Sequence, residues 1–314
     1  MLWVGAIDAL WDKCGPLLSP EREPWVFAAC ADNGALRQHT FLTGRALLKH
    51  ALVEQGVLAA KSPLPELTIS EHGRPCLPES LGVDFNLSHA YGFMALSLEP
   101  GPQGVDLELA WPDLKRPSQS LSERVFSPDE LAHWQDLFAP VLAELSALGA
   151  LPAKGRLPQV ELEVLSESAR AALNEACRYF KRQWTLREAL VKLIGSSIFV
   201  LDSMDIDIKA GHCGFKAERI PSSADLTTPD EDAHLLAMLA GKSLPQGFLV
   251  SVFLPPFLDL HAVPQLKSDY TRSHAALVLS LFCPESCDLL TLQVLGAEGF
   301  CTLSVPVEQR LAVR

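Results

Sequence analysis

Two stretches of the chain carry acidic and basic side chains at spacings that could support joint chemistry. In the first, Trp184, Glu188 and Lys192 recur every four residues, so on a helix they form one row on the surface. The row places a carboxylate and an ammonium group one turn apart. Such spacing is common for a solvated ion pair, which stabilises a helix by only about 0.3 to 0.5 kcal/mol. A chemical role therefore needs a second acidic group from elsewhere in the chain.

The second stretch, GVDLELAWP at residues 104–112, supplies that group as Asp106 and Glu108. The two residues are two positions apart, so on a strand their carboxylates point to the same face. Two carboxylates on one face repel each other unless a cation lies between them. Mg²⁺ suits this arrangement because it binds carboxylate oxygens and keeps water ligands for a phosphate-bearing substrate. A solvent-facing strand edge is the alternative interpretation.

Three further residues are candidates for contacts with an anionic ligand. Ser88 and His89 end an alternating segment that begins at Val83, and Arg74 lies in a turn between a glycine and a proline. Histidine at a strand end is more often structural than catalytic, and an arginine in a turn is often only solvated. A serine hydrolase is disfavoured because the chain has no G-x-S-x-G motif.

Periodicity indicates the elements that must position these residues. The apolar stripe of Leu186, Ala189, Leu190 and Leu193 predicts that the row around Glu188 belongs to an amphipathic helix. The predicted elements of the first half are a helix over 41–56, a short strand over 67–70, and two strands over 83–88 and 93–98 joined by a turn at Tyr91 and Gly92.

In the second half, Ser127, Pro128 and Glu130 have the spacing of a helix start with a capping box. Proline and glycine around 147–158 suggest an exposed excursion between residues 137 and 166. Further predictions are a strand after Gly195, a loop over 221–233, a strand over 248–254 and a β-like segment from 261. Helix, strand, loop and closing strand thus occur twice, which suggests two related halves with a ligand site at their interface.

The balance of charge excludes some classes of partner. The chain has 314 residues, of which 26 are Lys or Arg and 38 are Asp or Glu, so its formal net charge is −12. This charge repels nucleic acid and anionic membrane surfaces, so we expect neither as a partner. A phosphate-bearing ligand must then be held by a local basic cluster. The cluster around Glu188 contains Arg178, Lys181, Arg182, Arg187 and Lys192.

Cysteine usage and apolar runs predict a cytoplasmic protein. The eight cysteines are scattered without a C-x-x-C motif, as is typical of reduced, buried thiols. The N-terminal segment MLWVGAIDALW lacks a basic region and contains Asp8, so we expect no signal peptide. The apolar run over 275–283 is too short to span a bilayer.

Four motifs, taken together and in order, resemble those of the Sfp-type 4′-phosphopantetheinyl transferases. They are N-L-S-H at 86–89, G-V-D-L-E at 104–108, F-S-P-D-E at 126–130 and W-T-L-R-E-A-L-V-K at 184–192. G-R-P at 73–75 is similar to the G-K-P turn of that family, so the resemblance covers residues 41–254. It implies an α+β fold of two similar, pseudo-twofold halves. The expected boundaries are 1–103 and 104–260 for the halves and 261–314 for a C-terminal extension.

The resemblance also implies a reaction. The phosphopantetheine arm of coenzyme A would pass to a serine of an acyl or peptidyl carrier protein, leaving 3′,5′-ADP. Asp106, Glu108 and Glu188 would hold Mg²⁺ against the pyrophosphate of coenzyme A. Lys192 would stabilise charge on the transferred phosphoryl group, and Glu188, directly or through a metal-bound water, would be the base for the carrier serine.

Further residues take implied roles in binding coenzyme A. Ser88 and His89 would contact the pyrophosphate together with Lys192, and Arg74 would contact the 3′-phosphate. The family often has a basic residue before its first helix motif, where this chain has His39 and Thr40. Arg37 or Arg45 would replace that contact.

Two other regions depart from the family or extend its pattern. Arg187 stands where the family commonly has a lysine, which keeps the charge but changes the geometry. Lys115, Arg116 and Arg124 are candidates for docking an acidic carrier helix, and a solvated basic loop is the alternative.

Two other functions stay open beside the transferase. The first is an inactive homologue that binds coenzyme A or a carrier protein. The second is an unrelated nucleotide hydrolase, which is disfavoured because Gly241, Lys242 and Ser243 lack the earlier glycine of a P-loop, position 236 being Leu. We expect a monomer, because both halves of the proposed cleft are present in one chain.

Overall fold

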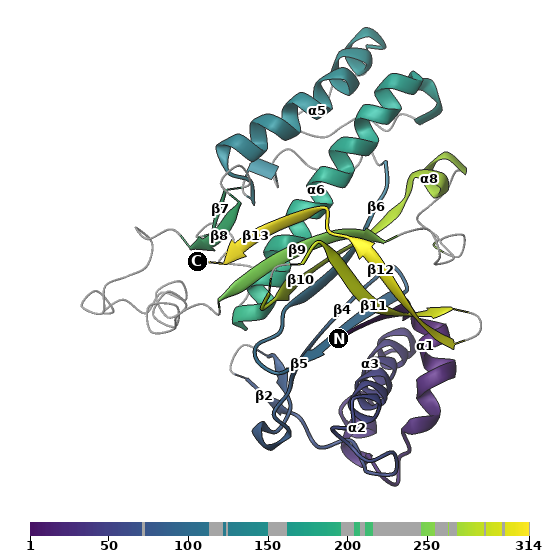
Figure 1. Ribbon diagram of the computed structural model, residues 1–314. Coiled ribbons are helices and arrows are strands. Elements are labelled where there is room, and N and C mark those ends of the chain that lie inside the picture. The colour runs from purple at the N-terminus through teal and green to yellow at the C-terminus, as the bar shows by residue number, and fades with distance from the viewer. Residues whose placement is uncertain are drawn as a thin grey trace, which may run out of the picture.

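Two β-sheets form the centre of the protein, and helices cover their outer faces (Figure 1). The computed structural model describes residues 1–70, 73–112, 122–123, 125–149, 162–195, 204–207, 211–215, 246–254, 263, 269–285, 287–296 and 299–313. This mixed arrangement of strands and helices agrees with the predicted α+β class. The pseudo-twofold relation of two halves, and the boundaries at 103 and 260, stay predictions.

The N-terminal part begins with a strand and a run of helices and continues mainly as strands. In chain order its elements are β1 (Leu2–Ala6), α1 (Ile7–Cys14), the 3₁₀ helix η1 (Gly15–Leu17), α2 (Pro24–Ala28), α3 (Ala35–Glu54), β2 (Thr68–Ile69), β3 (Pro75–Cys76), the 3₁₀ helix η2 (Glu79–Leu81), β4 (Asp84–Ala90), β5 (Phe93–Glu99) and β6 (Val105–Ala110).

The C-terminal part contains the longest described helix, α6, its partner α5 and most of the second sheet. Its elements are α5 (Pro128–Ala147), the 3₁₀ helix η3 (Leu162–Val164), α6 (Glu167–Ile194), β7 (Met204–Asp207), β8 (His212–Phe215), β9 (Gly247–Leu254), α8 (Asp269–His274), β10 (Ala276–Cys283), β11 (Leu289–Gly296), β12 (Gly299–Pro306) and β13 (Gln309–Val313).

The first sheet has the strand order β12-β11-β1-β5-β4. Its hairpin β4–β5 turns at Tyr91 and Gly92, whose φ angles are 51° and 86°. Two successive residues with positive φ are typical of the tight turn that matches the twist of hairpin strands. The predicted pair of strands and its turn are therefore confirmed.

The second sheet has the order β6-β10-β9-β13-β8-β7. The segment from residue 261 contributes β10, between β6 and β9, and β13, between β9 and β8. The same segment gives β11 and β12 to the first sheet, where β11 pairs in parallel with β1. The predicted β character of this segment is confirmed, and its strands are integral to both sheets.

The two sheets pack against each other through alternate side chains of their strands. On β1, Leu2 and Val4 face the second sheet, whereas Trp3 belongs to the core beneath α1 and α3. On β10, Leu277 and Leu279 face the first sheet. Successive side chains of a strand point to opposite faces, so each of these strands contributes to the core on both sides of its sheet. The result is four layers: α1 and α3, the first sheet, the second sheet, and α5 with α6 (Figure 1).

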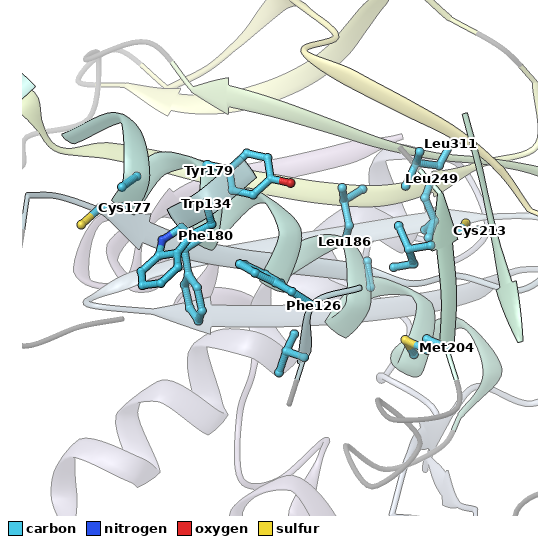
Figure 2. Close-up of a cluster of buried hydrophobic side chains, with 14 of the residues drawn as sticks. Phe126, Trp134, Cys177, Tyr179, Phe180, Leu186, Met204, Cys213, Leu249 and Leu311 are labelled. Carbon is cyan, nitrogen blue, oxygen red and sulfur yellow. The ribbon is translucent and has the colours of Figure 1, made fainter. Parts of the chain in front are cut away.

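The outer layer of α5 and α6 has its own apolar core (Figure 2). Figure 2 shows aromatic side chains of both helices at one end of this core and Leu249 and Leu311 of the second sheet at the other. The predicted stripe of α6 is buried throughout: Leu186, Ala189, Leu190 and Leu193. The capping box at Ser127 is confirmed as well.

Several boundaries differ from those that the sequence predicted. The helix expected from residue 41 begins at Ala35, after Gly34. Its first turns were missed because they are exposed and carry little apolar periodicity. Helix α5 continues to Ala147 with Pro140 inside it, so the first part of the expected excursion is helical. The predicted loop over 221–233 lies outside the described residues.

Cysteines and apolar segments bear on two further predictions. None of the eight cysteines, all of which lie among the described residues, forms a disulfide bond; Cys14, Cys30, Cys177 and Cys213 are buried, whereas Cys301 is exposed. Among the described residues, none of the helices is both long and apolar enough to cross a membrane.

Candidate active site

A pocket of about 350 Å³ lies where the edge strands of the two sheets meet beneath α6. Strand β4 ends one sheet and β6 ends the other, so their free edges face each other. Three elements that are far apart in sequence thus contribute to one cavity. Its lining consists of Leu87, Ser88, His89, Asp106, Leu107, Glu108, Trp184, Glu188 and Lys192.

The link between β4 and β6 is made by side chains in place of a strand ladder. The backbone N–H of Val105 donates to Asn86 Oδ1 at 3.1 Å, and that of Leu107 donates to Ser88 Oγ at 3.1 Å. A buried edge strand must find partners for its N–H groups. Asn86 and Ser88 of the N-L-S-H motif supply them and fix β6 against the first sheet. The role of Asn86 was not predicted, because a motif gives no strand pairing.

Asp106 is the most buried carboxylate of the pocket, with 5% of its surface exposed. Its Oδ1 accepts hydrogen bonds from Ser88 Oγ at 2.9 Å and from Lys192 Nζ at 2.6 Å. Its Oδ2 is buried without a hydrogen-bond partner among the described residues. Burial raises the pKa of Asp106, although Lys192 and Ser88 lower it. The site therefore holds a carboxylate oxygen for which the surrounding protein provides no donor.

Lys192 supplies the positive charge at the centre of the pocket. Its ammonium group donates to Asp106 and, at 3.0 Å, to Ser88 Oγ. These bonds use two of its three donors. The side chain is 26% exposed, so the ammonium group is accessible from the pocket that it lines.

Glu188 and Glu108 complete the acidic set. Burial raises the pKa of Glu188, the carboxylate of Asp106 raises it further, Lys192 lowers it and Glu108 raises it. The three carboxylates are thus close enough to repel one another. Glu108 Oε2 accepts a hydrogen bond from Lys181 Nζ at 2.8 Å. The sequence had placed Lys181 only in the general basic cluster.

The donor set fits a hard divalent cation by its chemistry. Three carboxylates line one pocket, and Asp106 Oδ2 has no hydrogen-bond donor among the described residues. An ion that binds oxygen ligands, such as Mg²⁺, would neutralise this charge and supply a partner for that oxygen. However, the described residues contain no group of three His, Cys, Asp or Glu side chains already arranged around a common point for a metal. Asp106 forms an ion pair with Lys192, and Glu108 forms one with Lys181. The expected metal site therefore stays a prediction.

The other predicted ligand contacts lie at different distances from this pocket. His89 lines it, and burial followed by the charge of Lys192 lowers its pKa. Arg74 is not among the lining residues, and its guanidinium group bonds to protein oxygens. Its predicted contact with the 3′-phosphate is not tested by these observations.

The two arginines of α3 are also outside the pocket lining. Arg37 is exposed. Arg45 lies over the ring of Phe41, with 4.6 Å between its Cζ and the ring centroid, and burial lowers its pKa to about 10. Their contacts with coenzyme A stay predictions. Lys115, Arg116 and Arg124, expected to dock a carrier, lie outside the described residues.

Arg187, the neighbour of Glu188 in sequence, points away from the pocket. Its side chain is 2% exposed and forms an ion pair with Glu130 of α5, with 2.5 Å between Nη2 and Oε2. Glu130 Oε2 also accepts the backbone N–H of Ser127 in the capping box. The cluster that the sequence gathers around Glu188 therefore divides, with Arg187 joining two helices and Lys192 serving the pocket.

The fold and the pocket define a mixed α/β protein with an acidic, lysine-containing site, and sequence relatives identify its family. No protein-family model matches the chain. It is 30% identical over 182 residues to the 4′-phosphopantetheinyl transferase AcpT of Escherichia coli K12, a match that covers 56% of this chain and 70% of that protein. The AcpT of Salmonella typhimurium LT2 is 30% identical over 189 residues, 60% of this chain and 74% of that protein. The 4′-phosphopantetheinyl transferase psf-1 of Bacillus pumilus is 26% identical over 157 residues, half of each chain.

The chain therefore belongs to the 4′-phosphopantetheinyl transferase family. This confirms the resemblance that the four motifs indicated.

Proposed function

We propose that the protein transfers the phosphopantetheine arm of coenzyme A to a serine of an acyl or peptidyl carrier protein and releases 3′,5′-ADP. The observation that carries the proposal is the pocket itself. It gathers Ser88 and His89, Asp106 and Glu108, and Glu188 and Lys192 from three separate segments. These are the residues of the family motifs, in a chain whose relatives are named as transferases of this kind.

In the proposed reaction, the carrier serine attacks the phosphorus atom that bears the pantetheine arm. A new P–O bond forms to the serine oxygen, and the bond between the two phosphates of coenzyme A breaks. The leaving group departs as 3′,5′-ADP. Catalysis of phosphoryl transfer depends mainly on positioning and on charge stabilisation, so the fixed charges of the pocket are its main contribution.

Asp106, Glu108 and Glu188 would hold Mg²⁺, which would neutralise the pyrophosphate and polarise the reacting phosphoryl group. Lys192 lies next to this acidic set, and Ser88 and Asp106 fix the position of its ammonium group. A cation that is oriented before the reaction stabilises developing charge without reorganisation. Lys192 is therefore assigned to the transferred phosphoryl group.

Glu188 is assigned as the base that takes the proton of the carrier serine, directly or through a metal-bound water. A general base is most efficient when its pKa is near the working pH. In the metal-free protein, burial and then the carboxylate of Asp106 raise the pKa of Glu188, and Lys192 lowers it. Its position in the lining of the pocket makes it accessible to a substrate hydroxyl group.

The test is the mass of a carrier protein after incubation with the enzyme, coenzyme A and Mg²⁺. A mass gain of one phosphopantetheine that disappears with EDTA and with Glu188→Ala supports the proposal. Glu175→Ala, at an exposed position of the same helix, is the matched control and keeps full activity. Binding of coenzyme A without mass gain on several carriers would instead indicate an inactive homologue, and phosphate release without a carrier would indicate a hydrolase.

We further propose that the enzyme acts as a cytoplasmic monomer. The residues that the family motifs assign to the site all lie in this one chain and line one pocket, so the proposed reaction needs no side chain from a second copy. Light scattering after size exclusion, at the concentration of the activity assay, measures the molar mass and therefore the oligomeric state.

A further inference from the structure

The guanidinium group of Arg74 joins three parts of the chain next to the pocket. Its side chain is 14% exposed, and both of its terminal nitrogens donate hydrogen bonds to protein oxygens. Nη1 donates to the carbonyl groups of Lys192 at 2.9 Å and Leu193 at 3.3 Å, and Nη2 donates to Asp84 Oδ2 at 2.5 Å, Phe85 O at 3.2 Å and Gln103 O at 3.0 Å.

The contact with Lys192 and Leu193 falls on the last turn of α6. The final carbonyl groups of a helix have no partner within the helix, and the helix dipole makes this end negative. Helix α6 ends at Ile194, and the next residue, Gly195, has a left-handed conformation with φ 67°. Arg74 supplies both donors and a positive charge at this end, so it acts as a C-terminal cap from a distant segment.

Asp84, the first residue of β4, holds the guanidinium group in place. Its Oδ2 accepts the bond from Arg74 and a second one, at 3.0 Å, from the backbone N–H of Gln103. A planar guanidinium group bonded on both edges has a fixed orientation. Arg74 therefore connects the last turn of α6 to the start of β4 and to the loop before β6.

We propose that Arg74, oriented by Asp84, is a positioning residue that fixes the last turn of α6, so that the ammonium group of Lys192 faces Ser88 and Asp106. This inference rests on the proposed function, because Lys192 is the residue that it positions for catalysis. It differs from the prediction that Arg74 contacts the 3′-phosphate of coenzyme A, since the donors of its guanidinium group are directed at protein oxygens.

Dephospho-coenzyme A, which lacks the 3′-phosphate, separates the two roles. If Arg74 positions α6, Arg74→Ala lowers kcat on the order of 10- to 100-fold, the range expected for a small misplacement of a reacting group. The loss is the same for both substrates, so the ratio of their kcat/KM values equals that of the wild type. Arg74→Lys, which keeps a charge without the planar fork, recovers only part of the rate. A variant that mainly loses its preference for coenzyme A over dephospho-coenzyme A overturns the proposal.

Hydrogen exchange tests the same inference without turnover. In the ligand-free protein, Arg74→Ala should speed amide exchange in residues 190–195 at the end of α6, and Asp84→Asn should do so to a smaller extent while keeping the arginine. Arg22→Ala removes an exposed arginine that does not line the pocket and serves as the control. Unchanged exchange at the end of α6 in both variants contradicts the positioning role, even if the proposed transfer reaction proves wrong.

Discussion

At the scale of single residues, the pocket keeps charge where burial makes charge costly. Asp106 is almost fully buried, and Glu188 is surrounded by two other carboxylates. A buried carboxylate oxygen without a donor destabilises the folded state. Such groups persist at functional sites, where a ligand or an ion supplies the missing partner. We therefore expect the three carboxylates to lower the stability of the metal-free protein while serving the function of the pocket.

Glu188→Gln tests this loss of stability and its dependence on pH. Because the pKa of Glu188 is raised above its ordinary value of 4.5, the folded state binds the proton more tightly than the unfolded state does. Stability is then lost as the pH rises from 4.5 through the raised pKa. Glutamine lacks this charge, so the metal-free variant should unfold at a higher temperature than the wild type at pH 8.

Thermal unfolding in EDTA at a series of pH values measures the difference. It should shrink as the pH falls and vanish below about pH 4.5, where the glutamate is protonated in both states. Glu175→Gln, at an exposed position, is the control and should show no such dependence. A Glu188→Gln protein that is less stable than the wild type at pH 8 would contradict the unfavourable charge.

Much of the residue-level site could be predicted from the sequence, and the reasons are local. Glu188 and Lys192 follow from helical spacing, and Asp106 and Glu108 from strand spacing. Their convergence on one pocket, now seen, required the family resemblance as well. The partners Lys181 and Asn86 could not be predicted, because their contacts join segments that are distant in sequence.

At the scale of elements, the close approach of α6 to β6 brings Glu188 and Lys192 of the helix next to Asp106 and Glu108 of the strand. Gly104, just before β6, makes this approach possible. A Cβ atom there would collide with the carbonyl oxygen of Ala189 and lie 2.8 Å from both N and Cβ of Leu193. The glycine of the G-V-D-L-E motif therefore has a packing reason, which the motif alone did not reveal.

Gly104→Ala should destabilise the protein and lower its activity, because α6 must move away from β6. Overpacking of this kind costs about 1 to 3 kcal/mol, measured as the change in the free energy of unfolding in urea. Gly34→Ala is the matched control, since a Cβ there meets no atom within 4 Å and its φ angle is −61°. Equal stability of the two variants would contradict the account of the helix–strand contact.

The contact between α5 and α6 depends on the buried pair of Arg187 and Glu130. Removing one partner of such a pair leaves an uncompensated charge, so Arg187→Ala should cost about 3 to 5 kcal/mol of unfolding free energy. Arg187→Met combined with Glu130→Gln removes both charges and keeps a side-chain acceptor for the capping box. The double variant should lose much less than the sum of the single changes. Additive losses in this cycle would show that the two residues do not interact.

Elements with strong local signals were predicted well, and those defined by distant contacts were not. The capping box at Ser127 and the turn at Gly92 depend on neighbouring residues, and both are confirmed. The start of α3 at Ala35 was missed because Leu36 is exposed and the first turns show no apolar period. The strand β1 was not recognised, because its run LWVGA is buried on both faces and lacks alternation.

At the scale of the whole molecule, the C-terminal segment holds the two sheets together. Strand β10 separates β6 from β9, and β11 separates β1 from β12. The sequence indicated strands here but could not give their partners, since each pairs with a strand far away along the chain. The expectation of a C-terminal extension therefore carried no information on this role.

Removing residues 276–314 should prevent folding. The deletion takes away Leu277, Leu279 and Leu292 from the core between the sheets and leaves β6 without its neighbour in the ladder. Near-ultraviolet circular dichroism and thermal unfolding of the shortened chain should show no cooperative transition. As a control, Leu289→Ser changes an exposed residue of the same segment and should leave the transition in place. A shortened chain that unfolds cooperatively would contradict the integral role of these strands.

The central claim is that Asp106, Glu108 and Glu188 share one divalent cation beside the pyrophosphate of coenzyme A. Electron paramagnetic resonance of Mn²⁺, used in place of Mg²⁺, measures that ion directly in the presence of coenzyme A. The wild type should bind one Mn²⁺ per chain, and the combined variant Asp106→Asn, Glu108→Gln and Glu188→Gln should bind it at least about 10-fold more weakly. If the folded variant binds Mn²⁺ as the wild type does, the three carboxylates are not its ligands.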